Sequence, residues 1–216
     1  MVSLWVATYG LTYVLSSWLF GSESPWSVPL AMAGYTTSLL LWLFRTGRFR
    51  ALGLRPLRQM RLGVYPLLLL LPVCNLLTAG GFFMEPPSIL LMLSVCAAEE
   101  IFFRGFLLRR LIRHGILPAV LISSGVFALF HLVNLLGGRS PAYICMQVLC
   151  AFTVGVFYGA VAIRSESLIP CFVAHFLTNI TAVPVTGVDG SWLCLCIATY
   201  GGFGIFLCRK YASKTR

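Results

Sequence analysis

The chain has 216 residues, of which 59% are hydrophobic and only 10% carry a charge, and its mean hydropathy is +0.91. Charged residues make up about 25% of an ordinary water-soluble domain, so this composition excludes that class. The net charge of +10 does not indicate a nucleic-acid partner, because the basic residues gather in the short segments between apolar runs, as in membrane proteins. We therefore predict a multi-pass membrane protein whose main partner is the lipid bilayer, with no nucleic-acid partner.

Apolar runs of membrane-spanning length follow one another along the whole chain, separated by turn residues and basic loops. A helix that rises about 1.5 Å per residue needs about 20 residues to cross the hydrocarbon core. The runs that we expect to span are residues 1–20, 28–44, 63–84, 88–108, 118–136, 142–163, 168–183 and 191–207. The predicted fold class is all-α, a single integral-membrane domain over residues 1–216 built as a polytopic bundle of about eight transmembrane helices.

The positions of the basic residues test this number of spans, because arginine and lysine accumulate on the cytoplasmic side of a membrane. With eight spans, the basic segments 45–61, 109–113 and 209–216 and Arg164 all fall on one side, and the other side receives only Arg139. Seven spans would divide these groups between the two faces. We therefore expect both termini to be cytoplasmic.

The fourth apolar run contains Glu99 and Glu100, followed by Arg104. The whole chain has only six acidic residues, and an ionisable group in hydrocarbon is costly enough to indicate a functional site. Residues four apart share a helical face, so Glu100 and Arg104 should pair, whereas Glu99 lies about 100° further round. We interpret Glu100 and Arg104 as structural and Glu99 as free for chemistry. In the alternative, both acids are structural and pair with Arg104 and with Arg109 or Arg110 near the membrane surface.

Further polar side chains lie inside predicted spans at a depth that Glu99 can share. His131 lies in the fifth span, with Phe127 four residues earlier on the same face and able to pack against the imidazole. His175 and Asn179 share a face of the seventh span. Counted from the span ends, the acid, the two imidazoles and the amide all lie about 10 to 21 Å from the cytoplasmic side. The four groups can therefore meet in one layer of the bundle.

A carboxylate and an imidazole that meet at one water molecule can act as a general base for hydrolysis. We predict that Glu99 and His131 are catalytic and activate water, and that His175 and Asn179 stabilise the oxyanion of the transition state. The alternative uses Glu99, His131 and His175 as ligands of a catalytic zinc ion. The chain has no HExxH motif, and zinc would leave Asn179 without a role. We therefore favour the mechanism without a cofactor.

Three short motifs, each within a predicted span, resemble those of a known family when they are taken together and in order. They are Glu99-Glu100-xxx-Arg104, Phe127-xxx-His131 and His175-xxx-Asn179. The set looks like the signature of the CPBP family (CAAX protease and bacteriocin-processing, or Abi), intramembrane proteases related to the type II CAAX prenyl endopeptidases. The motif-bearing core covers about residues 87–184, and eight spans also fit that family's core. The resemblance implies the catalytic, oxyanion-stabilising and structural roles given above and a glutamate-type mechanism. The small size of the chain looks more like a prokaryotic member of the family than the eukaryotic enzyme that trims prenylated proteins, so we expect a prokaryotic cell membrane.

The leading hypothesis is an intramembrane endopeptidase that hydrolyses a peptide bond of a peptide or membrane-protein substrate, near the cytoplasmic half of the bilayer. Two alternatives from other classes stay open. One is a non-enzymatic membrane protein of the same family, such as a bacteriocin-immunity or scaffolding protein. The other is a proton-coupled transporter with Glu99, His131 and His175 as its proton relay, although the sequence shows no internal repeat.

Overall fold

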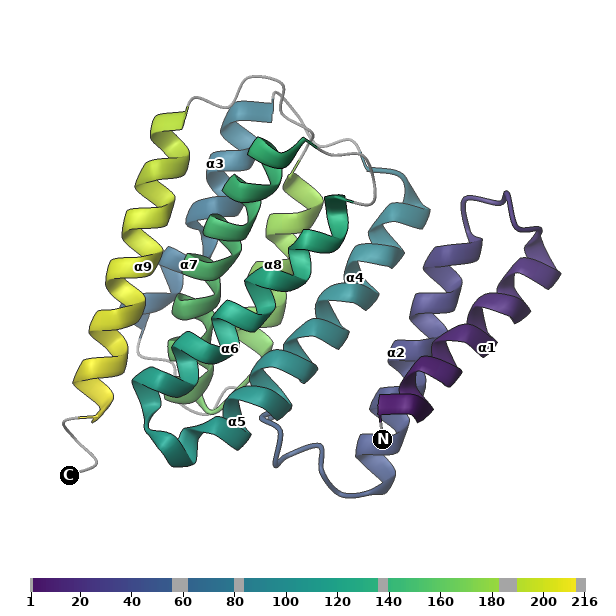
Figure 1. Cartoon of the computed structure of the whole chain (residues 1–216), viewed down its shortest axis with the longest axis horizontal. Helices are drawn as coiled ribbons and strands as arrows, with labels where there is room; N and C mark the ends of the chain where they lie inside the picture. Colours follow the sequence, from purple (N-terminus) through teal and green to yellow (C-terminus); the bar gives the residue numbers. More distant parts are fainter. Residues whose placement is uncertain (1, 56–61, 80–83, 136–139, 183–189, 213–216) are drawn as a thin grey trace.

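The computed structural model describes residues 2–55, 62–79, 84–135, 140–182 and 190–212, and all the regular structure in these ranges is helical. The helices are α1 (Val2–Phe20), α2 (Ser27–Arg45), α3 (Leu70–Ala79), α4 (Pro86–Glu100), the short α5 (Leu108–Leu111), α6 (Ile116–Phe130), α7 (Pro141–Ser165), α8 (Ile169–Thr181) and α9 (Gly190–Ala212). They form a bundle with the α1–α2 hairpin on one side and α9 on the other (Figure 1). The predicted all-α fold class is confirmed.

Each predicted apolar run contains one main α-helix, and the third run shows the largest departure. Its first part, Leu62–Leu69, is a 3₁₀ helix that contains Pro66, and the α-helix begins only at Leu70. Proline has no N–H to donate and crowds the preceding turn, so it disfavours a regular α-helix there. Among the described residues, the stretches long and apolar enough to cross a membrane are Ser27–Arg45, Ile116–Leu135 and Pro141–Ser165. A total of eight crossings stays a prediction.

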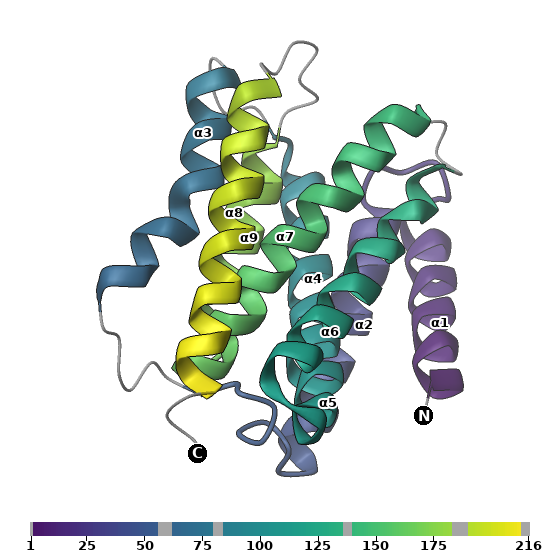
Figure 2. The same ribbon diagram turned by 60° about the vertical axis from the view of Figure 1, so that its left-hand side comes forward.

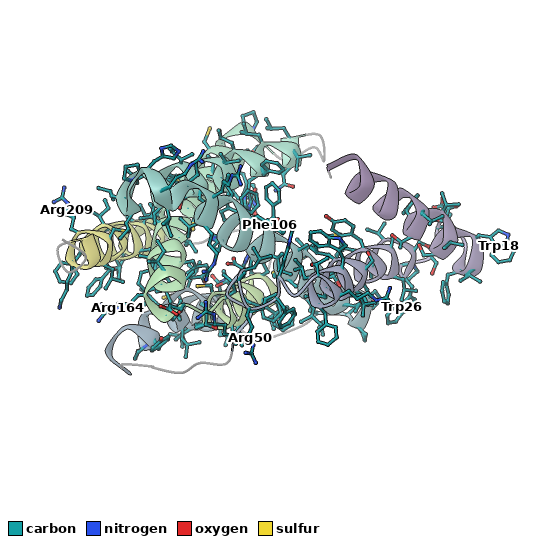
Figure 3. The ribbon with its side chains drawn as sticks, turned by 90° about the horizontal axis from the view of Figure 1, so that it is seen from below. Trp18, Trp26, Arg50, Phe106, Arg164 and Arg209 are labelled. Carbon is teal, nitrogen blue, oxygen red and sulfur yellow. The ribbon has the colours of Figure 1, made fainter. Side chains whose placement is uncertain are left out.

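The two ends of the bundle differ in charge. Helix α1 begins and α9 ends at the same end of the bundle (Figures 1 and 2), which is the arrangement that an even number of crossings requires. Seen from that end, Figure 3 shows Arg50, Arg164 and Arg209 spread across it. Arg139, the basic residue expected at the opposite end, lies outside the described residues. The arginines therefore gather at the end where we predict the cytoplasm.

Helix α7 forms the centre of the bundle. All ten residues from 153 to 162 are buried, so this part of α7 is enclosed on every side. Helix α9 packs against it closely at Gly204, where a Cβ would lie 2.8 Å from Cγ1 of Val156 and 2.9 Å from the backbone nitrogen of Phe157. Small residues allow this close approach of two helix backbones inside a membrane. Gly204 is therefore required by packing.

Helix α4 is the element that carries the acidic pair, and its neighbours hold it from both sides. On one side, α2 packs against it, and Oγ1 of Thr36 donates to the carbonyl oxygen of Ser94 at 3.0 Å. On the other side it contacts α8. The helix does not stop at Glu100 but continues through a π-helical segment, Ile101–Leu107, into α5. Such wider turns within α-helices occur frequently at functional sites, and this one begins directly after the two glutamates.

Candidate active site

The predicted pair between Glu100 and Arg104 is present. Nη1 of Arg104 donates to Oε1 of Glu100 at 2.9 Å, and the two side chains are only 1% and 2% exposed. The guanidinium also lies over the ring of Phe127, with Cζ 4.2 Å from the ring centroid. Buried charges of opposite sign need each other, because either one alone would stay desolvated without a partner. The spacing of four residues therefore predicted this contact correctly.

The imidazole of His175 joins the two glutamates. Its Nδ1 lies 3.0 Å from Oε1 of Glu100, and its Nε2 lies 3.6 Å from Oε2 of Glu99. An ionised carboxylate paired with Arg104 can only accept, so Nδ1 carries the hydrogen and donates it to Glu100. The remaining ring nitrogen is thereby directed at Glu99. Sequence reasoning assigned Glu99 and Glu100 to separate functions and did not foresee that one ring contacts both.

Glu99 is the more accessible of the two acids. Its side chain is 30% exposed, whereas that of Glu100 is 1% exposed. Glu99 interacts electrostatically with His175 and with His131, and its direct contact is with His175. Of the two predicted acids, the buried Glu100 therefore holds the imidazole of His175, and the more accessible Glu99 lies beside the same imidazole. An accessible carboxylate is the one that can reach a water molecule or a substrate.

His131 lies where α6 ends. The α-helix stops at Phe130, and a 3₁₀ turn, His131–Leu135, follows. Nδ1 of His131 lies 3.1 Å from the carbonyl oxygen of Phe127. A carbonyl only accepts, so Nδ1 carries the hydrogen, and in the neutral ring Nε2 keeps the free lone pair. The turn is tied to α7 by Asn134, whose Nδ2 donates to Oε1 of Gln147 at 3.0 Å.

Phe127 packs at the centre of these side chains. Its ring centroid lies 5.0 Å from that of His131 and 5.7 Å from that of His175, both edge to face. A third edge-to-face neighbour is Phe103, at 5.1 Å. The predicted packing of Phe127 against His131 is therefore confirmed, and the same ring also borders His175 and Arg104. One aromatic side chain thus contacts both imidazoles and the guanidinium of Arg104.

Asn179 has a partner that sequence reasoning missed. Its Nδ2 donates to Sγ of Cys96 at 3.3 Å, and Cys96 is fully buried on α4. Cys96 lies four positions before Glu100 on α4, and Asn179 lies four positions after His175 on α8. Because the two helices run antiparallel, both steps move about one turn in the same direction, so the Cys96–Asn179 contact follows the Glu100–His175 contact in register. In the sequence, the only signal was that Cys96 precedes Glu100 by four residues.

The end of α8 that carries Asn179 is held by α3. Nδ2 of Asn75 donates to the carbonyl oxygen of Thr178 and to Oγ1 of Thr181, both at 3.3 Å. The carbonyl oxygen of Thr178 also accepts from the backbone nitrogen of Ala182 at 2.9 Å, so Asn75 adds a second hydrogen bond, from a neighbouring helix, to the last turn of α8. Asn75 was not singled out in the sequence because it belongs to none of the three motifs.

The zinc alternative can be compared with the same geometry. It requires Glu99, His131 and His175 to converge on one point. Within the described ranges, however, no three or more His, Cys, Asp or Glu side chains are grouped so that they could hold a metal ion. Each imidazole has its own partner for Nδ1 and keeps Nε2 available, an arrangement that metal-ligating histidines also have. What speaks against zinc is therefore only that the side chains do not converge on one point. The donor set in the described part of the chain therefore does not form a preformed zinc site.

The helices and the composition define an integral membrane protein with a buried site of carboxylates and imidazoles on α4, α6 and α8. Residues 83–181 match the family described as type II CAAX prenyl endopeptidase, Rce1-like. This segment of the chain is a domain of that family, and it contains all three motifs. The resemblance inferred from the motifs is thereby confirmed. No curated protein and no solved structure matches the chain.

Proposed function

We propose that the protein is an intramembrane endopeptidase that cleaves a peptide bond in a peptide or membrane-protein substrate. The observation that carries the proposal is the contact of the accessible Glu99 with His175, an imidazole whose other nitrogen is held by the buried Glu100–Arg104 pair. Family membership supplies the reaction class, since the matching family is one of prenyl endopeptidases. The proposal includes about eight membrane crossings with both termini cytoplasmic, as the positions of the basic residues predict.

The chemistry follows from which atoms remain available. Glu99 accepts a proton from a water molecule, and Nε2 of His131 accepts the second hydrogen bond of that water. The water oxygen attacks the carbonyl carbon of the substrate. Nδ2 of Asn179 and Nε2 of His175, when that nitrogen carries a proton, donate to the resulting oxyanion. The C–N bond then breaks, and the proton held by Glu99 passes to the leaving nitrogen.

The arrangement also explains why two neighbouring glutamates are present. Glu100 and Arg104 neutralise each other, and the carboxylate of Glu100 fixes the orientation of the His175 ring. A ring that is already oriented need not be ordered when the oxyanion forms. Glu99 keeps its accessible side chain for the proton transfer. Proton transfer is therefore assigned to Glu99, and orientation of the imidazole is assigned to its neighbour Glu100.

The test is peptide cleavage by the purified chain reconstituted in liposomes. The probes are quenched fluorescent peptides that end in CAAX sequences, with and without a farnesyl group. We expect Glu99→Gln and His131→Ala to lower cleavage about 10²- to 10⁴-fold, the usual contribution of general acid–base catalysis. Glu85→Gln and His114→Ala are matched controls, because both residues are exposed and outside the site, and they should cleave as the wild type does.

Two results would overturn this function. One is a folded wild-type protein that cleaves neither kind of peptide. The other is a Glu99→Gln variant as active as the Glu85→Gln control, because the proton transfer assigned to Glu99 would then be unnecessary.

A further inference from the structure

Three segments that are far apart in the sequence meet at the basic end of the bundle. They are the loop after α2, the short helix α5 and the turn between α7 and α8. The backbone nitrogen of Leu168 donates to the carbonyl oxygen of Gly53 at 2.8 Å, and Oγ of Ser167 donates to that of Arg55 at 2.8 Å. Gly53 has φ = +86°, and a Cβ there would overlap Nη2 of Arg109. Only glycine both adopts this conformation and leaves room for the guanidinium.

The charges in this junction do not balance. Nη1 of Arg55 pairs with Oε2 of Glu166 at 2.9 Å. Arg109 lies near both, but its Nε is buried and has no hydrogen-bond partner within the described part of the chain. Partial burial and the nearby Arg55 lower the pKa of Arg109, and Glu166 only partly offsets this. Two guanidiniums therefore lie near one carboxylate, which pairs with Arg55 alone, and Arg50 and Arg164 add further positive charge on the same face (Figure 3).

A half-buried guanidinium that makes no hydrogen bond in the described part of the chain calls for an acceptor, because a desolvated donor without a partner is costly. Its Nε is enclosed, so the terminal nitrogens of Arg109 are the atoms that an outside ligand can reach. Two neighbouring guanidiniums fit the oxygens of a phosphate well, since the planar fork can donate two hydrogen bonds to one group. Glu166 is the only acidic residue near this junction in the described segments, and Arg55 already occupies it. The ligand should therefore be an anion that comes from outside the protein.

The position of the junction indicates the source of that anion. Arg109 directly follows the buried Leu108, at the point where the fourth apolar run ends. Ile169, which begins α8 beside the junction, exposes 37% of its surface. A charged junction bordered by exposed apolar side chains at the end of a span lies at the level of lipid headgroups. An acyl chain can pack on the apolar side while the phosphate reaches the arginines.

We propose that Arg55 and Arg109 form a binding site for the phosphate of an anionic phospholipid at the basic end of the bundle. The site is separate from the proposed active site and does not depend on the proposed protease activity. Its lipid fixes the junction between the loop after α2, α5 and the turn before α8. It therefore connects the membrane surface to the two helices that carry Glu99 and His175.

Native mass spectrometry and thermal unfolding of the detergent-purified full chain test the site. The added molecules are phosphatidylglycerol, phosphatidylcholine and inorganic phosphate at equal concentrations. We expect one phosphatidylglycerol to be retained and to raise the unfolding temperature, with no such effect from the other two. Arg109→Gln should weaken phosphatidylglycerol binding about tenfold or more, as expected for loss of a charge-assisted contact. Glu166→Gln should strengthen it, because Arg55 loses its internal partner.

The matched control is Arg110→Gln, which removes the same charge from the next residue, an exposed one. It should reduce binding much less than Arg109→Gln does. Equal losses in the two variants would overturn the site in favour of diffuse surface charge. Inorganic phosphate binding as well as the lipid, or equal retention of phosphatidylcholine, would also overturn it. If Arg109→Gln unfolds, Arg55→Gln and Glu166→Gln must still shift the affinity in opposite directions, and the site is wrong if they do not.

Discussion

The buried pair of Glu100 and Arg104 allows the most direct test of the site's architecture. Replacing Arg104 by methionine keeps most of the side-chain volume but removes the cation from the carboxylate of Glu100, which is 1% exposed and keeps only the Nδ1–H of His175 as a partner. Removing one partner of a buried ion pair costs about 3–5 kcal/mol. The substitution also removes the guanidinium from the face of Phe127, 4.2 Å from the ring centroid. For a chain of this size, that loss lowers the unfolding temperature by about 6–20 °C.

The assay is thermal unfolding in detergent, followed by tryptophan fluorescence, for Arg104→Met, Glu100→Gln and the double variant. The double variant carries no unpaired charge, so we expect it to be more stable than Arg104→Met alone. The coupling between the two substitutions should be at least about 1 kcal/mol. A fall of less than about 2 °C for Arg104→Met, or a double variant that loses the sum of the two single losses, would refute this account of the buried pair.

Two further predictions concern packing around the site. Cys96→Val should lower peptide cleavage about tenfold, because the thiol contacts the amide of Asn179 and also lies beside the imidazole of His175. The loss should be smaller in an Asn179→Ala background, and Cys96→Ser should keep most of the wild-type rate. Fully additive losses of Cys96→Val and Asn179→Ala would contradict this. Gly204→Ala should destabilise the fold by about 1–3 kcal/mol through overcrowding of α7 and α9. Gly202→Ala should not destabilise the fold, because a Cβ at that position meets nothing within 4 Å. Equal unfolding temperatures for the two variants would show that the close approach of α9 to α7 does not require glycine at position 204.

The helices could be predicted well because their signals are local. Each apolar run produced one main α-helix, and the departures are the 3₁₀ stretch that contains Pro66, the π-helical segment after Glu100 and the 3₁₀ turn that begins at His131. Pairs four residues apart were also correct, as the contacts of Glu100 with Arg104 and of Phe127 with His131 show. Such contacts depend on the geometry of a single helix, or on the turn that ends it.

The contacts between helices could not be predicted in the same way. Helix α4 is apolar on almost every side, so its sequence has no polar stripe that would reveal which face meets α8. The rotation and register of the two helices decide that His175 contacts both glutamates and that Cys96 meets Asn179. Likewise, only the folded chain brings Gly53 beside Arg109.

The sequence by itself determined the class of protein, the order of its helices and the residues of its three motifs, because hydropathy and helical spacing act over a few turns. The tertiary structure alone decided which motif residues share a partner. That choice depends on the packing of whole helix surfaces against one another, to which residues outside the motifs, such as Asn75 and Cys96, also contribute.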